Sequence, residues 1–145
     1  MKQVEFNLAY IPSPKGRPRI TKKGFAFTPA KTRKAEADLK VLIQDKLQEG
    51  FEPFLGPVRL VLIVFLPRPK SHFRSGKNAH LLKDGMTKWH WKRPDLDNLE
   101  KLFMDAAQGI LYKDDAQISE KSSMKMYADK GAPGYFVRIE ELDSK

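Results

Sequence analysis

One segment of the chain carries acidic residues whose type and spacing suit a divalent cation. Asp95 and Asp97 flank a leucine, and a second acidic pair, Asp114 and Asp115, follows beyond one predicted helix. Carboxylate oxygens are hard ligands, and Mg²⁺ is usually held by a few of them while water and phosphate oxygens fill its other positions. A magnesium ion, or a pair of them, can polarise a phosphodiester and lower the pKa of a bound water. We therefore take Asp95, Asp97 and Asp115 as candidate metal ligands.

The local sequence limits how these carboxylates can meet. Pro94 disfavours helix in the residue before it, so we expect a helix to begin near Asp95. Side chains two residues apart on a helix point in nearly opposite directions, so Asp95 and Asp97 converge only if Asp95 is an extended N-cap. Asp115 would have to return beside them through a tertiary contact. The competing interpretation is structural: acids at a helix start cap amides, and an Asp-Asp pair is common in turns.

Lys101 lies four residues after Asp97, on the same face of the predicted helix. In a structural role it would form an i,i+4 ion pair with that aspartate. In a functional role it would stabilise negative charge that develops on a phosphate in the transition state. The spacing alone supports both roles equally.

Positive charge is concentrated in two segments of a chain with net charge +9. Residues 12–34 contain eight basic residues and no acid, and residues 67–94 contain eight basic residues against Asp84. Such concentration is typical of a surface that follows phosphates, although two solvated basic loops would look the same. Trp89 and Trp91 stand within the second segment, where they either stack on unpaired bases or fold onto the core. The candidate DNA contacts are Arg17, Arg19, Arg68, Lys70, Arg74, Lys92 and Arg93.

Composition excludes several other kinds of chemistry. The chain has no cysteine, so disulfides, thiolate zinc sites and cysteine nucleophiles are excluded. His72, His80 and His90 lack zinc-site spacing, an EF-hand starting at Asp95 would lack its glycine and glutamate, and there is no nucleotide-binding phosphate loop. No membrane span or secretory pattern is present, and we expect a cytoplasmic protein with no membrane partner.

The remaining pattern predicts one domain, residues 1–145, that positions these groups. Alternation predicts strands over residues 4–10, 118–127 and 135–142, and a β-branched run predicts a buried strand over 58–66. Helical spacing predicts one helix capped by Thr28, with Pro29 at its first position, and a second from Asp95 to Gly109. Residues 25–27 are expected to be extended, and residues 67–94 to form a long polar connection. The order β-α-β-α-β-β predicts an α+β two-layer fold with helices against a mixed, mostly antiparallel sheet.

The segment from residue 92 to 117 resembles the signature of the RusA-type Holliday junction resolvases. The resemblance rests on a basic-Pro-Asp-Leu-Asp-Asn-Leu-x-Lys run, on Asp105 within the helix, and on Asp-Asp-Ala-Gln after it. It implies a homodimer that binds four-way DNA junctions and nicks two opposed strands to leave 5′-phosphates, using Mg²⁺, for which Mn²⁺ may substitute, in recombination and repair. By position it implies catalytic roles for Asp95, Asp97, Asp115 and Lys101, and a secondary or structural role for Asp114.

Two other functions fit the same residues. One is a less selective nuclease for flaps or other branched DNA that uses the same acids. The other is a non-catalytic nucleic-acid-binding module in which the aspartates only cap a helix and form a turn. Cleavage of a synthetic four-way junction distinguishes these functions from a resolvase.

Overall fold

A four-stranded mixed sheet forms the centre of the computed structural model, which describes residues 2–16, 18–129 and 132–143. The strand order is β1-β6-β4-β5, in which β4 and β5 run parallel and the other neighbours are antiparallel. The strands are β1 (Gln3–Leu8), β4 (Val58–Leu66), β5 (Ile118–Tyr127) and β6 (Gly134–Glu141). The predicted α+β class and element order are confirmed.

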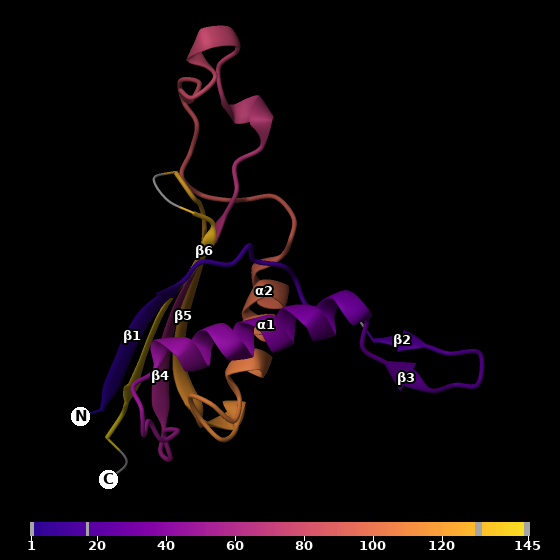
Figure 1. Cartoon of the computed structure of the whole chain (residues 1–145), viewed down its shortest axis with the longest axis vertical. Helices are drawn as coiled ribbons and strands as arrows, with labels where there is room; N and C mark the ends of the chain where they lie inside the picture. The colour runs from indigo at the N-terminus through magenta and orange to yellow at the C-terminus, as the bar shows by residue number, and fades with distance from the viewer. Residues whose placement is uncertain (1, 17, 130–131, 144–145) are drawn as a thin grey trace.

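Two helices, α1 (Ala30–Lys46) and α2 (Leu96–Ala107), cover one face of this sheet (Figure 1). Alternate residues of β4 are buried beneath them, which explains the period of two in its sequence. The buried stripe of α2 packs on the same layer, because its apolar residues recur every three or four positions. The largest fully buried side chains include Leu39, Ile43, Leu60, Leu62, Leu99, Leu102, Phe103, Tyr112, Tyr135 and Ile139.

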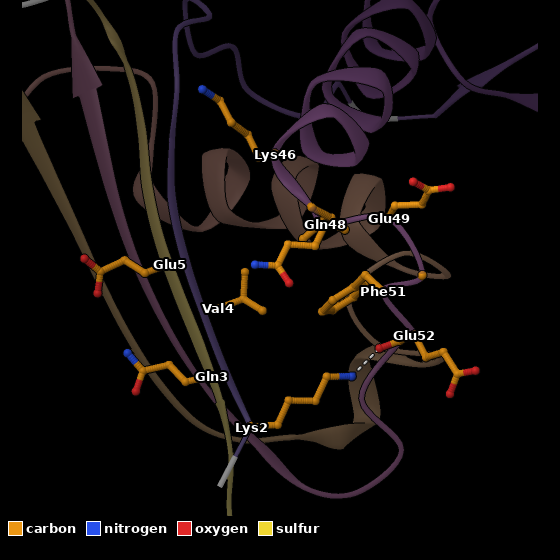
Figure 2. Close-up of a pocket in the computed structure, with 11 residues that line it drawn as sticks. Lys2, Gln3, Val4, Glu5, Lys46, Gln48, Glu49, Phe51 and Glu52 are labelled. Atoms are coloured by element: carbon orange, nitrogen blue, oxygen red, sulfur yellow. Dashed lines mark hydrogen bonds between the residues drawn. The ribbon is translucent and has the colours of Figure 1, made fainter.

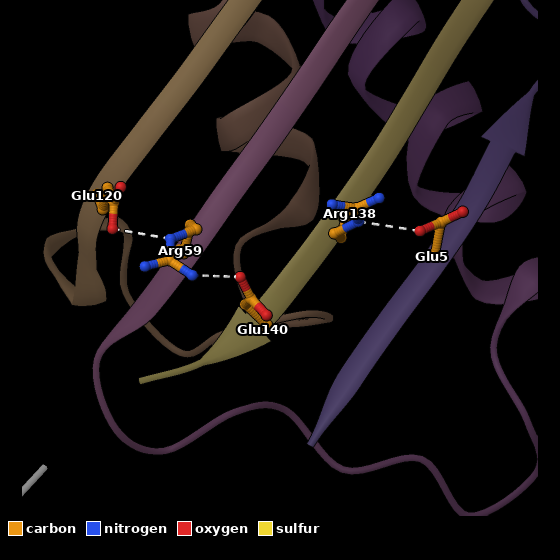
Figure 3. Close-up of polar contacts among 5 residues, drawn as sticks. All are labelled: Glu5, Arg59, Glu120, Arg138 and Glu140. Atoms are coloured by element: carbon orange, nitrogen blue, oxygen red, sulfur yellow. Dashed lines mark hydrogen bonds and ion pairs between the residues drawn. The ribbon is translucent and has the colours of Figure 1, made fainter. Parts of the chain in front are cut away.

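The opposite face of the sheet carries a row of paired charges (Figure 3). Arg59 donates to Glu120 at 2.7 Å and to Glu140 at 2.5 Å, bridging from β4 to both neighbouring strands. Arg138 donates to Glu5 of β1 at 2.9 Å. Since these two cations are neutralised within the chain, the basic character that we associate with phosphate binding lies elsewhere in the molecule.

The ends of the helices correct one prediction and confirm another. Thr28 does not cap α1; Pro29 occupies the N-cap position in extended geometry, one residue later than expected. Asp95 is the N-cap of α2, as predicted, and the peptide bond between Arg93 and Pro94 is cis. Gly109, with φ +86°, provides the left-handed turn that follows the helix.

Two segments extend from this body (Figure 1). The extended piece expected at residues 25–27 is one side of a hairpin formed by β2 (Arg19–Ile20) and β3 (Ala26–Phe27). The long connection over residues 67–94 contains two 3₁₀ turns, η1 (Lys70–His72) and η2 (Gly76–Asn78), and projects away from the sheet. The sequence also predicts a turn around Gly131, Pro133 and Gly134 between β5 and β6, and of these residues Gly131 lies outside the described part of the chain. No described helix has both the length and the apolar character needed to cross a membrane.

Candidate active site at the start of helix α2

The carboxylates of Asp95 and Asp97 are exposed and unengaged at the N-terminal end of α2. Asp95 has extended geometry (φ −70°, ψ 143°), but its side chain makes no capping hydrogen bond. Asp97 lies in the first helical turn. Within the described residues, no hydrogen bond or ion pair occupies either carboxylate. The structural interpretation of Asp95 as a side-chain cap is therefore wrong, and both groups are available to a cation.

Lys125 of β5 reaches the backbone that leads into this helix. Its Nζ donates to the carbonyl of Lys92 at 2.6 Å and to that of Pro94 at 2.9 Å. Burial lowers the pKa of Lys125, and the nearby Asp95 carboxylate partly offsets this effect. The lysine thus fixes the residue that precedes Asp95 and places a positive charge next to its carboxylate.

Sequence reasoning missed Lys125, although a signal for it exists. β5, the strand after α2, turns back along the helix. A period of two puts Lys121 and Lys125 on one side of the strand. Lys121 forms an ion pair with Glu100 near the middle of α2, and Lys125 reaches its start. The two lysines therefore contact the middle of the helix and the segment that leads into it.

Lys101 and Asp105 follow Asp97 at intervals of four residues and lie on the same side of α2. No ion pair joins Lys101 to Asp97 among the described residues, so the structural role considered for this lysine is not seen. Asp105 pairs with Lys15, whose backbone N–H also donates to the carbonyl of Asn98 at 3.1 Å. These two contacts fasten the first basic segment along α2, and Asp105 raises the pKa of Lys15. Asp105 is consequently neutralised, whereas Lys101 remains free.

Asp115 lies beyond the opposite end of α2. Its backbone N–H donates to Oε1 of Gln108 at 3.3 Å, directly after the last helical residue. A helix of 12 residues is about 18 Å long, so this position is well separated from Asp95. No three Asp, Glu or His side chains of the described residues form a group that could hold a metal ion. The expectation that Asp95, Asp97 and Asp115 of one chain meet around one ion is therefore corrected: β5 does turn back, but Asp115 precedes the turn.

Asp114 has a structural role. Its carboxylate accepts from the N–H of Ala116 at 2.8 Å, and the Gln117 side chain accepts from the N–H of Asp114 at 3.0 Å, completing a capping box. The Gln117 amide also donates to the carbonyls of Phe54 and Gly56. This network holds the short turn that presents Asp115. Burial raises the pKa of Tyr112, and the negative charge of the exposed Asp115 carboxylate adds to this effect.

A groove of about 840 Å³ is lined in part by the two residues that precede Asp95. It is lined by residues 9–14, by the start of α1 with Lys31 and Lys34, and by Arg93 and Pro94. A second groove of about 430 Å³ shares Pro14 and Lys31 with it and extends to Arg19. Lys34 is paired with Asp38 at 2.7 Å, whereas Lys31 and Arg93 form no ion pair within the described part of the chain and supply the positive charge of this groove. Together the grooves form a cationic path that leads away from the two acids.

A third pocket, of about 570 Å³, lies beside the start of β1 and the end of α1 (Figure 2). Lys2 enters it and lies 4.4 Å from the centre of the Phe51 ring. None of the candidate acids lines this pocket. Its position separates it from the path formed by the other two grooves.

The structure corrects the prediction that Arg68 contacts DNA. Its side chain is only 2% exposed, and its guanidinium pairs with Asp129. The same group donates to the carbonyl of Thr87 at 2.9 Å and lies over the Tyr127 ring at 4.6 Å. Since these contacts occupy its donors, Arg68 holds the base of the 67–94 connection and is unavailable to phosphate.

The five other candidate DNA contacts that the structure describes are exposed. Lys70, Arg74, Lys92 and Arg93 lie on the 67–94 connection, and Arg19 lies on the hairpin. Arg74 is partly engaged, by the carbonyl of Leu82 at 3.2 Å and by Asp84 at 3.3 Å. Arg17 lies outside the described residues.

Neither tryptophan of the second basic segment is packed into the core. Trp89 is 47% exposed and pairs through its backbone with Met126 of β5, whereas Trp91 is 70% exposed. The ammonium of Lys92 lies 3.9 Å from the Trp91 ring centre. The alternative in which both rings fold onto the core is wrong, and Trp91 presents the more accessible ring.

Comparison with known proteins identifies relatives of this chain. The family described as endodeoxyribonuclease RusA matches residues 9–140. A protein of Bacillus subtilis (strain 168), the uncharacterized protein YqaN, is 29% identical over 147 residues, which include 99% of this chain and 100% of that protein. The family match spans both grooves, α2 and Asp115.

Proposed function

We propose, from the premise that this chain belongs to the RusA family of endodeoxyribonucleases, that it is a Mg²⁺-dependent resolvase of four-way DNA junctions. In this proposal it makes paired, symmetric nicks that leave 5′-phosphates, in DNA recombination and repair. The observation that carries the proposal is the pair of unengaged carboxylates, Asp95 and Asp97, which directly follow Arg93 and Pro94 in the lining of a groove that also contains Lys31.

The donor set at the start of α2 fits a magnesium ion. Mg²⁺ is commonly held by one or two carboxylates, with water and phosphate oxygens in its other positions. Asp95 and Asp97 supply two such groups, both open to solvent. When bound, the ion would polarise the scissile phosphate and lower the pKa of a water. Mn²⁺ offers the same preference for oxygen ligands and is expected to substitute.

The basic residues around this pair have separate tasks. Arg93 and Lys31 would bind backbone phosphates and lead the strand along the groove to Asp95. Lys101, exposed on the same face of α2 as Asp97, would stabilise negative charge on the phosphate as the bond to the leaving oxygen breaks. Lys125 would act as a positioning residue, because it holds the Pro94 carbonyl.

A homodimer would explain both the paired cuts and the position of Asp115. Two symmetric nicks require two active sites related by a two-fold axis. With Asp115 beyond the far end of α2, a second subunit is one source of a third carboxylate for each site. We therefore include Asp115 of the second subunit in the proposed ligand set.

Incubation of the protein with a labelled four-way junction and Mg²⁺ tests this proposal. Paired nicks at symmetry-related positions, with ends that a ligase can seal, are the expected result. Single or scattered cuts would instead favour the less selective branched-DNA or flap nuclease. Binding without cleavage, in both Mg²⁺ and Mn²⁺, would favour the non-catalytic nucleic-acid-binding module.

A further inference from the structure

The β2–β3 hairpin is an arm whose side chains are all open to solvent. Every residue from 18 to 27 is exposed, including Ile20 at 74% and Phe25 at 70%, and Figure 1 shows the hairpin extending beyond the start of α1. Phe27, at 45%, adds a third large apolar side chain. Apolar groups gathered on an exposed element are a common mark of an interaction surface.

The arm has a defined shape and a fixed root. Across its turn the N–H of Thr21 donates to the Phe25 carbonyl at 2.8 Å, and the N–H of Phe25 donates to Oγ1 of Thr21 at 3.0 Å. At its root the N–H of Gly16 donates to the buried Thr32 of α1 at 2.9 Å. A Cβ on Gly16 would lie 2.8 Å from that hydroxyl, so the close approach requires glycine. The body of the protein therefore determines where the arm begins.

One face of the hairpin carries two aromatic rings. Arg19 pairs directly with Phe27 across the strands, so their side chains share a face. Phe25 immediately precedes β3 and lies two residues before Phe27, so the strand period of two, continued one residue beyond β3, assigns it to the same face. Two residues of a strand span about 6.8 Å, twice the roughly 3.4 Å rise between successive bases. One unpaired base therefore fits between the two rings.

The charge of the arm suits a nucleic acid rather than an ordinary protein surface. Arg19, Lys22 and Lys23 accompany the rings, and the chain has no acidic residue between Glu5 and Glu36. Basic side chains that track phosphates, combined with aromatic rings that stack on bases, form the usual platform for unpaired strands. The second groove ends at Arg19 and shares Lys31 with the groove beside Asp95. Basic side chains therefore line both grooves between Arg93, two residues before Asp95, and Arg19 of the hairpin.

We propose that the β2–β3 hairpin is a base-stacking arm that recognises unpaired bases at the branch point of DNA. Phe25 and Phe27 hold an unpaired base, and Arg19, Lys22 and Lys23 contact the flanking phosphates. This inference rests on the proposed function, in which branched DNA is held at the acids and brings a base near its branch point to the arm. It assigns the preference for branches over continuous duplex to a segment outside the α2 site.

The test uses the full chain and a four-way junction with 2-aminopurine at the branch point, in EDTA to prevent cleavage. Wild-type protein should change the fluorescence of the branch-point base, and the same label within an arm should respond little. The double variant F25A/F27A should lose this response and bind the junction about tenfold more weakly, with little change for linear duplex. F25L/F27L should behave like the alanine variant, since it keeps apolar volume without rings, and F25Y/F27Y should behave like wild type.

The exposed Val41 of α1 provides a matched control, because V41A shortens an apolar side chain that is 56% exposed and lies outside the arm. V41A should leave junction binding and the fluorescence response unchanged. The arm proposal is overturned, while the proposed function stands, if F25A/F27A or F25L/F27L keeps both the fluorescence response and the wild-type affinity for the junction. An equal loss of affinity for junction and duplex would overturn it as well. If wild-type protein neither prefers nor cuts the junction with Mg²⁺, the proposed function itself fails and the arm proposal falls with it.

Discussion

Lys125 donates to the carbonyl of Pro94 at 2.9 Å, and so a strand residue fixes the backbone that immediately precedes Asp95. The contact joins β5 to the start of α2, two elements whose relative placement decides where the Asp95 carboxylate points. The second hydrogen bond, to the Lys92 carbonyl, holds the entry into the helix at another point. The geometry of the candidate site therefore depends on β5 as well as on the acidic motif.

We expect K125M to cut a four-way junction roughly 10–100-fold more slowly while binding it with nearly wild-type affinity. Methionine keeps the aliphatic stem but leaves both carbonyls without their donor, and small displacements of a catalytic group are costly. Single-turnover cleavage measures the effect. K121M is the matched control, since Lys121 pairs with Glu100 further along α2. Equal losses of cleavage in both variants would contradict a positioning role for Lys125.

Neutralisation of Lys70 and Arg74 together should weaken junction binding and flatten its dependence on salt. Each lost phosphate contact reduces the slope of log K against log salt concentration by about 0.9 for duplex DNA. Titrations at several salt concentrations measure this slope. Removal of Arg68 should instead lower thermal stability, because its guanidinium is bound to Asp129 and Thr87. An unchanged slope for the K70A/R74A variant would remove those two residues from the DNA-binding surface.

The lowered pKa of His90 predicts how the stability of the protein changes as the pH falls. Burial, followed by the charges of Lys125 and His72, lowers the pKa of His90 below its usual 6.5. A histidine with a lowered pKa contributes stability that is fully present above pH 6.5 and is lost as pH falls toward the lowered value, because only the unfolded chain takes up the proton. Thermal unfolding followed across this range should show that loss in the wild type and a smaller one in H90F. An NMR titration of His90 with a midpoint at or above 6.5 would contradict this account.

Mixing two inactive variants tests whether Asp115 serves the second subunit. D97N and D115N should each fail to cut as homodimers. In a mixed dimer that shares residues between subunits, one site combines both substitutions and the other contains none, so nicking should return to about a quarter of the wild-type level if subunits mix at random. Sites built within one chain would leave every mixed dimer inactive. Continued inactivity of a mixture shown to contain mixed dimers would remove Asp115 of the second subunit from the proposed site.

The parts of the structure that follow local rules were predicted well. The limits of β4 and β5 agree with the sequence pattern, because alternation and β-branched residues decide them locally. The N-cap position of Asp95 follows from Pro94 in the same way. Thr28 failed as a cap because Pro29, already extended, occupies the position one residue later.

The parts that depend on distant contacts could not be predicted. Arg68 and Arg93 look alike in sequence, since each lies beside a proline in a basic run, yet only Arg68 meets a carboxylate 61 residues later. Asp115 could be assigned to the site by its chemistry, but its place depends on where the chain turns after α2. That turn comes three residues after Asp115, at the start of β5, which leaves the aspartate at the far end of the helix.

Cleavage by D97N is the most direct test of a metal site at the start of α2. The substitution keeps the size of the side chain and removes one carboxylate charge next to the expected phosphate. We predict that D97N cuts a four-way junction at least about 1,000-fold more slowly in Mg²⁺ or Mn²⁺, while it binds the junction as tightly as the wild type or more tightly. Cleavage by D97N at the wild-type rate would contradict the account.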